Sequence, residues 1–310
     1  MPIPILIRFS AETTYFHNMK NAIIFGAGGQ DGFYLQALLQ NKGLEVVGVS
    51  RSGDFLKIAI ADYPQVEALI KQHQPDYIFH LAANSTTSHD AMFENHQTIA
   101  TGTLNILEAV RLHSSHTKIF ISGSGLQFVN QNKPIKETDA FEARDPYSVS
   151  RIQSVYAARY FRTMHDINTY IGYFFNHDSP RRSERHVAQK IASAAVRISK
   201  GSNERLRIGD INTIKEWTFA GDVVEAIWCL VSQESVFEAN LGSGIGYSIA
   251  DFLDECFALI GQDWKEYVDM DPGFEAEYKQ LVSDSSLIHS LGWKPKTSLK
   301  QLAQMMMQQP

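Results

Sequence analysis

The chain has 310 residues, 44% of them hydrophobic and 20% charged, which is typical of a globular protein with room for a full sheet and a smaller second lobe. A formal net charge of −6 provides no basic surface for nucleic acid, and the sequence has no apolar run of 18 residues to cross a membrane. The two cysteines, Cys229 and Cys256, are too few for a zinc site. We therefore expect reduced thiols, no metal and a cytoplasmic protein.

Short apolar runs alternate with segments of helical spacing. We expect residues 1–18 to be a mobile extension without a function of its own. Strands are predicted over 22–25, 45–49, 77–82, 118–122 and 168–174, and helices over 33–42, 66–73, 98–113 and 147–165. This alternation predicts a Rossmann-type, doubly wound parallel α/β sheet with right-handed crossovers.

The alternation loosens beyond residue 176. Helices are predicted there over 186–200, 222–233, 249–260 and 299–307, with Ser298 as the N-cap of the last one. We expect a dinucleotide-binding lobe over 19–175 and a smaller α/β substrate lobe over 176–310, interleaved in one compact unit.

A glycine-rich turn follows the first predicted strand. Gly26 permits the tight turn, Gly29 allows a pyrophosphate to approach the backbone, and Gly32 allows the following helix to pack on the strand. The amide groups at the helix start favour a phosphate. This context predicts a dinucleotide site.

The ends of the next strands predict the rest of that site. Arg51 follows the second strand and offers a cation for a 2′-phosphate, which favours NADP while leaving NAD possible. Two further groups are expected to contact the adenine and the nicotinamide ribose respectively: Asp62 and Tyr63, and Leu81, Ala82 and Ala83.

Several motifs resemble the extended short-chain dehydrogenase/reductase superfamily and, within it, the GDP-mannose 4,6-dehydratase branch. They are Gly29-Gln30-Asp31-Gly32 in the first turn, Pro146-Tyr147-Ser148-Val149-Ser150-Arg151, the segment 175–182 (FNHDSPRR), and Leu291-Gly292-Trp293-Lys294-Pro295. The resemblance implies a Rossmann lobe that holds NADP and a second lobe that holds a nucleoside diphosphate sugar. It also implies that Tyr147 exchanges a proton with the sugar while a hydride moves between C4 and the nicotinamide.

Three of the four positions around the active site depart from the pattern of that branch. Arg151 stands where the family has lysine, and it keeps a cation one helical turn from Tyr147. The threonine and glutamate of the family fall on Gly123 and Gly125, so Ser122 or Ser124 is left to bond the sugar oxygen. Loss of water across C5–C6 needs an acid and a base, which glycine cannot supply. Dehydration would then need another group, such as His177 or Asp178.

The substrate lobe retains part of the family pattern. The resemblance implies that Asn176 and Lys190 contact the sugar and the diphosphate, and we include Asn84 and Val187 in the same site. Lys215 stands where the family has an arginine, which weakens the inference to GDP. A long basic segment that joins subunits in this branch is absent after Arg51, so a homodimer through helices 98–113 and 147–165 is favoured over a tetramer.

Three functions fit these observations. The leading hypothesis is an NAD(P)-dependent oxidoreductase that reduces a 4-ketone or oxidises a 4-hydroxyl of a GDP-sugar-like substrate. The second is a true GDP-mannose 4,6-dehydratase with a relocated acid and base. The third is a catalytically silent protein that binds cofactor or nucleotide as a partner subunit.

Overall fold

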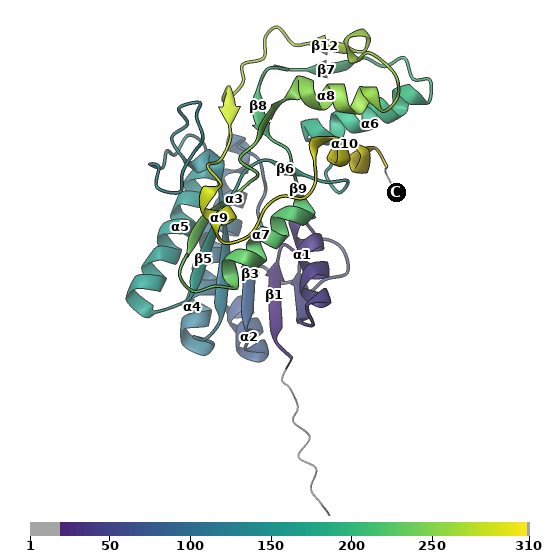
Figure 1. The fold of residues 1–310 in the computed structure, drawn as a ribbon. Helices are drawn as coiled ribbons and strands as arrows, with labels where there is room; N and C mark the ends of the chain where they lie inside the picture. The colour runs from purple at the N-terminus through teal and green to yellow at the C-terminus, as the bar shows by residue number, and fades with distance from the viewer. Residues whose placement is uncertain (1–18, 309–310) are drawn as a thin grey trace, which may run out of the picture.

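The computed structural model describes residues 19–308, so the predicted extension 1–18 lies outside the described residues. At its centre is a six-stranded, wholly parallel sheet (Figure 1) with the order β10-β5-β4-β3-β1-β2. The strands are β1 Asn21–Phe25, β2 Glu45–Val49, β3 Tyr77–His80, β4 Lys118–Ser124, β5 Thr169–Phe174 and β10 Glu238–Leu241. The predicted parallel α/β sheet is confirmed.

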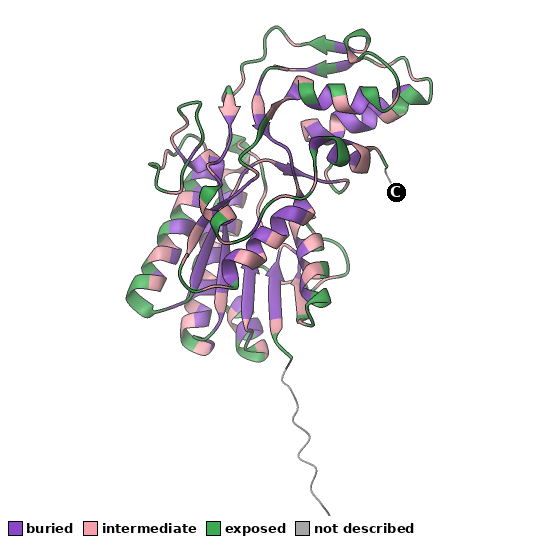
Figure 2. Ribbon diagram, viewed as in Figure 1, coloured by how far each residue is buried: buried purple, intermediate pink, exposed green. Residues whose placement is uncertain are grey.

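Helices cover both faces of this sheet. Helices α1 (Gln30–Asn41) and α7 (Ala220–Val231) pack against each other on one face, in a core that includes Leu35 and Ile227. The other face is covered by α2 Tyr63–His73, α4 Gly102–His113 and α5 Pro146–His165. In Figure 2 the strands are buried and the outward faces of the helices are exposed, as a doubly wound fold requires.

Most predicted elements differ from the structure by one to three residues at an end, and two parts of the chain differ more. The helix expected from residue 98 begins earlier, because α3 (Met92–Asn95) and a π-helical turn (His96–Thr101) lead directly into α4. The polar residues of this stretch give it no apolar stripe, which is why periodicity missed it. The edge strand β10, one of the short strands expected between the later helices, could not be given bounds, since it has only four residues and alternates polar with apolar side chains.

The substrate-lobe segment has a core of its own around three helices, α6 Val187–Ser199, α8 Ile249–Ala258 and α10 Leu299–Met307. As predicted, Ser298 caps α10 by accepting a hydrogen bond from the amide of Gln301. The short strands of this part of the chain are β6 His177–Asp178, β7 Leu206–Ile208, β8 Ile214–Glu216, β9 Thr218–Phe219, β11 Gly246–Ser248, β12 Val268–Met270 and β13 Gln280–Leu281. The short helix α9 Ser286–Ser290 packs instead on β10 and α7, in the core of the central sheet. Because β10 is a strand of the central sheet and α7 packs on that sheet, the chain crosses between the two predicted lobes more than once.

Candidate active site

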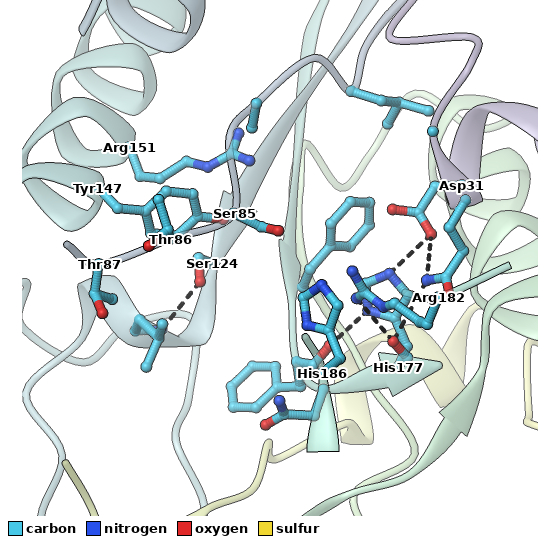
Figure 3. A pocket seen from close by; sticks show the side chains of 18 of the residues that line it. Asp31, Ser85, Thr86, Thr87, Ser124, Tyr147, Arg151, His177, Arg182 and His186 are labelled. Atoms are coloured by element: carbon cyan, nitrogen blue, oxygen red, sulfur yellow. Dashed lines mark hydrogen bonds and ion pairs between the residues drawn. The ribbon is translucent and has the colours of Figure 1, made fainter. Parts of the chain in front are cut away.

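A cavity of about 300 Å³ lies at the carboxyl ends of the central strands, where open α/β sheets bind their ligands. Its walls come from the glycine-rich turn, from the segments after β3 and β4, from α5, and from the segment after β5 (Figure 3). Among the predicted site residues, the lining includes Gly26, Gly29, Gln30, Asp31, Gly32, Leu81, Ala83, Ser124, Tyr147, Arg151 and Asn176.

The glycine-rich turn has the geometry of a phosphate cradle. Gly26 has a φ of +93°, and a Cβ there would lie 2.7 Å from the amide nitrogen of Ala82. A Cβ on Gly32 would lie 2.4 Å from the carbonyl oxygen of Gly26, so helix and strand approach as closely as predicted. Gly29 caps α1 without a side-chain hydrogen bond, which leaves the first amide groups of the helix available to a pyrophosphate.

A polar network joins this turn to the other lobe. His177 lies 2.9 Å from Asp31 through its Nε2 and 2.7 Å from the carbonyl oxygen of Phe175 through its Nδ1. Ser179 donates to the side-chain oxygen of Gln30 at 2.8 Å. The start of α1 is therefore held by residues that lie 146 to 149 positions further along the chain.

Charge sets the protonation of the central pair. Burial would raise the pKa of Asp31, but His177 and Arg182 together lower it to about 2. Burial would lower the pKa of His177, yet the neighbouring carboxylate raises it above its ordinary value. Both ring nitrogens face acceptors, which is the arrangement of a protonated imidazole. His177 is thus committed to structure, and this weakens its predicted role as a relocated acid or base.

Tyr147 and Arg151 lie one helical turn apart near the start of α5, and both line the cavity. The guanidinium carbon of Arg151 is 5.0 Å from the centre of the Tyr147 ring. Arg151 is buried, and its Nη1 donates to the backbone carbonyl of Ser122 and, at 2.7 Å, to the Ser122 hydroxyl. The cation is therefore fixed behind the tyrosine by the end of β4.

The hydroxyl of Ser122 is fully buried and belongs to this support. It donates to the backbone carbonyl of His80 at 2.9 Å while it accepts from Arg151. Burial and the nearby Arg151 lower the pKa of His80 to about 3, so no second cation faces the guanidinium. Of the two predicted serines only Ser124 lines the cavity, and its oxygen accepts from the amide of Leu126, which leaves its proton free to donate.

Aromatic rings fill the space beside the two departing glycines. A Cβ on Gly123 would lie 2.6 Å from Cδ1 of Tyr173, and a Cβ on Gly125 would lie 2.9 Å from Cε1 of Phe175. Both rings are buried, and the Tyr173 hydroxyl is held by Glu238 at 2.7 Å. The wall where the family carries threonine and glutamate therefore has no room for either side chain.

The predicted adenosine contacts lie outside the cavity. Arg51 is exposed and pairs with Glu94 at 2.7 Å. Asp62 caps α2 by accepting from the amide of Gln65, and the Tyr63 hydroxyl donates to Glu67 at 3.2 Å. Ala82 lies against Gly26 behind the turn, while its neighbours Leu81 and Ala83 reach the cavity.

The predicted substrate residues are dispersed. Asn176 lines the cavity, whereas Asn84 donates to Glu94 at 2.8 Å and Lys190 donates to the carbonyl oxygen of Arg207 at 2.5 Å. Lys215 is buried with its amine 4.7 Å from the centre of the Trp217 ring. Val187 begins α6 and does not line the cavity.

Sequence reasoning missed His186, which lines the cavity opposite Tyr147 (Figure 3). Burial lowers the pKa of this histidine, and the positive charge of Arg182 acts in the same direction. Its imidazole is therefore neutral near pH 7 and could accept a proton. In the sequence His186 is distinguished only by its position after the Arg181-Arg182 pair. That position does not indicate a catalytic role until the fold places the side chain in the cavity.

A model of the family described as GDP-mannose 4,6 dehydratase matches residues 23–306. The chain belongs to the GDP-mannose 4,6-dehydratase family. A relative described as GDP-mannose 4,6 dehydratase 2 of Arabidopsis thaliana is 33% identical, with 96% of this chain and 88% of the relative covered. A GDP-mannose 4,6-dehydratase of Vibrio cholerae is 28% identical, with 92% of each chain covered.

Solved structures agree on the fold of this GDP-mannose 4,6-dehydratase family member. RMD from Pseudomonas aeruginosa, solved in complex with NADPH, aligns with a TM-score of 0.83 at 21% identity, with 93% of this chain and 98% of that chain covered. A UDP-glucose 4-epimerase of Thermotoga maritima also aligns with a TM-score of 0.83, at 21% identity over 93% and 97% of the two chains. These findings confirm the predicted superfamily branch and, with it, the class of nucleotide-sugar-modifying enzymes.

Residues 19–308 have neither a membrane-spanning helix nor a cluster of potential metal ligands. Within this range no helix is long and apolar enough to cross a membrane. The same residues contain no group of three or more histidine, cysteine, aspartate or glutamate side chains placed to hold a metal ion.

Proposed function

We propose that this protein is an NADP-dependent oxidoreductase that acts at C4 of a GDP-sugar-like substrate, either reducing a 4-ketone or oxidising a 4-hydroxyl. The observation that carries the proposal is Tyr147, with the fixed cation of Arg151 beside it, in the same cavity as the start of α1, where no side chain caps the helix. The NADPH named with the Pseudomonas aeruginosa structure supports the choice of cofactor. Arg51, after β2, is the residue proposed for its 2′-phosphate.

Each retained side chain has a role in this reaction. The bound nicotinamide would supply or accept the hydride. Tyr147 gives a proton to, or takes one from, the oxygen on C4, and the positive charge of Arg151 is held beside its ring. Ser124 has a free hydroxyl proton with which to orient the same oxygen. Ser124 would thus replace the threonine that the family carries at Gly123, and hydride transfer at C4 needs no carboxylate at Gly125.

A second candidate is 4,6-dehydration, which the names of the relatives favour. It begins with the same oxidation at C4 and then needs a base for the C5 proton and an acid for the C6 hydroxyl. Because Phe175 occupies the space beside Gly125, these groups must come from elsewhere. His186 is a neutral titratable group in the cavity wall, and it supports this candidate.

The test is to incubate the protein in D₂O with GDP-mannose and NADP⁺, and with 4-keto nucleotide sugars and NADPH, and to follow NADPH absorbance and product mass. A change in NADPH without deuterium at C5 supports the C4 oxidoreductase. Deuterium at C5 with loss of water and no net change in NADPH supports the dehydratase. No change in either readout with any substrate refutes both and favours the silent partner protein.

Variants of α5 tie the activity to its proposed site. Tyr147→Phe should lower kcat by about 10² to 10⁴-fold, the contribution of a positioned proton carrier. Arg151→Lys should keep a measurable part of the activity, because an ammonium retains the charge but not the bonds to Ser122. Tyr156→Phe is the matched control, since Tyr156 is exposed on the same helix and outside the cavity.

We also propose that the protein is a homodimer through α4 and α5. Both helices are long and expose large apolar side chains: Leu104, Leu112, Tyr156, Tyr160 and Met164. Exposed apolar side chains on neighbouring helices are suited to a partner surface. A second copy of the chain would cover them in a symmetric interface.

A further inference from the structure

The Arg51–Glu94 ion pair joins two segments on opposite sides of the glycine-rich turn. Arg51 follows β2, whereas Glu94 lies in α3, which follows β3. In the sheet β1 lies between these two strands. The pair therefore bridges the adenosine end of the crevice in which the proposed dinucleotide would lie.

Arg51 can leave this ion pair more easily than Glu94 can. Arg51 is 74% exposed and Glu94 38%, and an exposed ion pair of this kind contributes at most about 1 kcal/mol. Glu94 is held independently, since its other carboxylate oxygen accepts from the side-chain amide of Asn84 at 2.8 Å. A competing anion would accordingly draw Arg51 away while Glu94 stays in place.

A 2′-phosphate is such an anion. It carries more charge than a carboxylate and accepts paired hydrogen bonds from a guanidinium. A phosphate that reaches Arg51 must nevertheless displace Glu94 and then remain near its negative charge. A dinucleotide with a plain 2′-hydroxyl does not need to displace Glu94 and places no negative charge beside it.

We infer that Glu94 is a specificity-determining residue that occupies Arg51 in the free protein and reduces the preference for NADP(H) over NAD(H). The inference rests on the proposed function, because it assumes that a nicotinamide dinucleotide binds in this crevice. It extends that function by naming the residue that sets the balance between the two cofactors.

The decisive variant is Glu94→Gln, which removes the charge and keeps an acceptor for Asn84. We expect the Kd for NADPH to fall about five- to tenfold and the Kd for NADH to change less than twofold, measured by titration of NAD(P)H fluorescence. Asp269→Asn is the matched control, because it removes one charge from the exposed ion pair between Asp269 and Arg205, which lies away from the dinucleotide crevice. It should leave both constants unchanged.

A second variant assigns the effect to Arg51. In Arg51→Ala the further change Glu94→Gln should alter the NADPH-to-NADH ratio less than twofold, since no guanidinium remains to be released. Binding of both dinucleotides with a ratio unaffected by Glu94→Gln overturns the inference and leaves the proposed function standing. Failure of wild-type protein to bind either dinucleotide overturns the proposed function and the inference with it.

Discussion

The Asp31–His177 pair links the cofactor turn to the second lobe, and we expect Asp31→Asn to destabilise the protein in a pH-dependent way. The two side chains lie 2.9 Å apart, with only 7% of the histidine side chain and 21% of the aspartate side chain exposed. Asparagine keeps an oxygen acceptor of the same size for His177 and Gln30. The variant therefore removes the charge with little change of shape.

The magnitude follows from the shift of the aspartate. Its pKa falls from 3.8 to about 2 on folding. One unit of pKa corresponds to 1.36 kcal/mol, so the interactions of the charged carboxylate with His177, Arg182 and Gln30 together contribute about 2 kcal/mol. The pKa of Asp31 is lowered on folding, so this contribution to stability is present above pH 3.8 and is lost as the pH falls toward 2. The pKa of His177 is raised on folding, so the stability that the charged imidazole contributes is present below pH 6.5 and is lost as the pH rises through the folded pKa. The effect should be largest between about pH 4 and 6.5.

Urea unfolding of the cofactor-free protein, followed by the fluorescence of its four tryptophans, measures this difference. At pH 5.5 the midpoint of Asp31→Asn should lie below that of the wild type by an amount equivalent to about 2 kcal/mol. At pH 9 the gap should be clearly smaller. Asp269→Asn, which breaks an exposed pair, should cost less than about 1 kcal/mol at both pH values. Equal losses for Asp31→Asn at pH 5.5 and pH 9 would refute the assignment of a charged His177.

Two further substitutions test the cavity wall and the proposed dimer. Gly125→Ala should destabilise the protein by about 1–3 kcal/mol in the same urea assay, because its Cβ would press on the buried ring of Phe175; an unchanged midpoint would show that the ring moves freely. Tyr160→Glu, on the exposed face of α5, should shift the protein from dimer to monomer in light scattering, whereas Met270→Glu on β12 should not. A wild-type monomer would contradict the dimer.

The sequence was sufficient for the parts of the fold that depend on local pattern. Strands such as Glu45–Val49 are short apolar runs bounded by breakers, and the glycine turn identifies its own place at the first crossover. The same local reasoning placed Tyr147 and Arg151 one turn apart on a helix. Helix boundaries were predicted wrongly where polar residues interrupt the helical spacing of apolar side chains. The π-helical turn His96–Thr101 that precedes α4 is an example.

Contacts between distant segments could not be predicted in this way. Nothing near Arg51 in the sequence indicates Glu94, and nothing near Asp31 indicates His177, because each pairing exists only after the parallel strands bring their carboxyl ends together. Ser122 was placed correctly beside Gly123 on its strand. Its hydroxyl nevertheless faces Arg151 rather than the cavity, and this direction depends on the packing of α5 against β4.

Neighbouring side chains compensate for the departures from the family pattern. This compensation indicates that the site keeps a packed wall although two of its side chains are missing. Deleting two side chains from a packed wall would leave cavities that lower stability. Here Tyr173 and Phe175 fill the space beside Gly123 and Gly125. The larger guanidinium of Arg151 likewise has its own acceptors at Ser122. A wall repacked around a retained tyrosine and a retained cation supports the proposed hydride exchange at C4, and it closes the position from which the family glutamate would act in the proposed site.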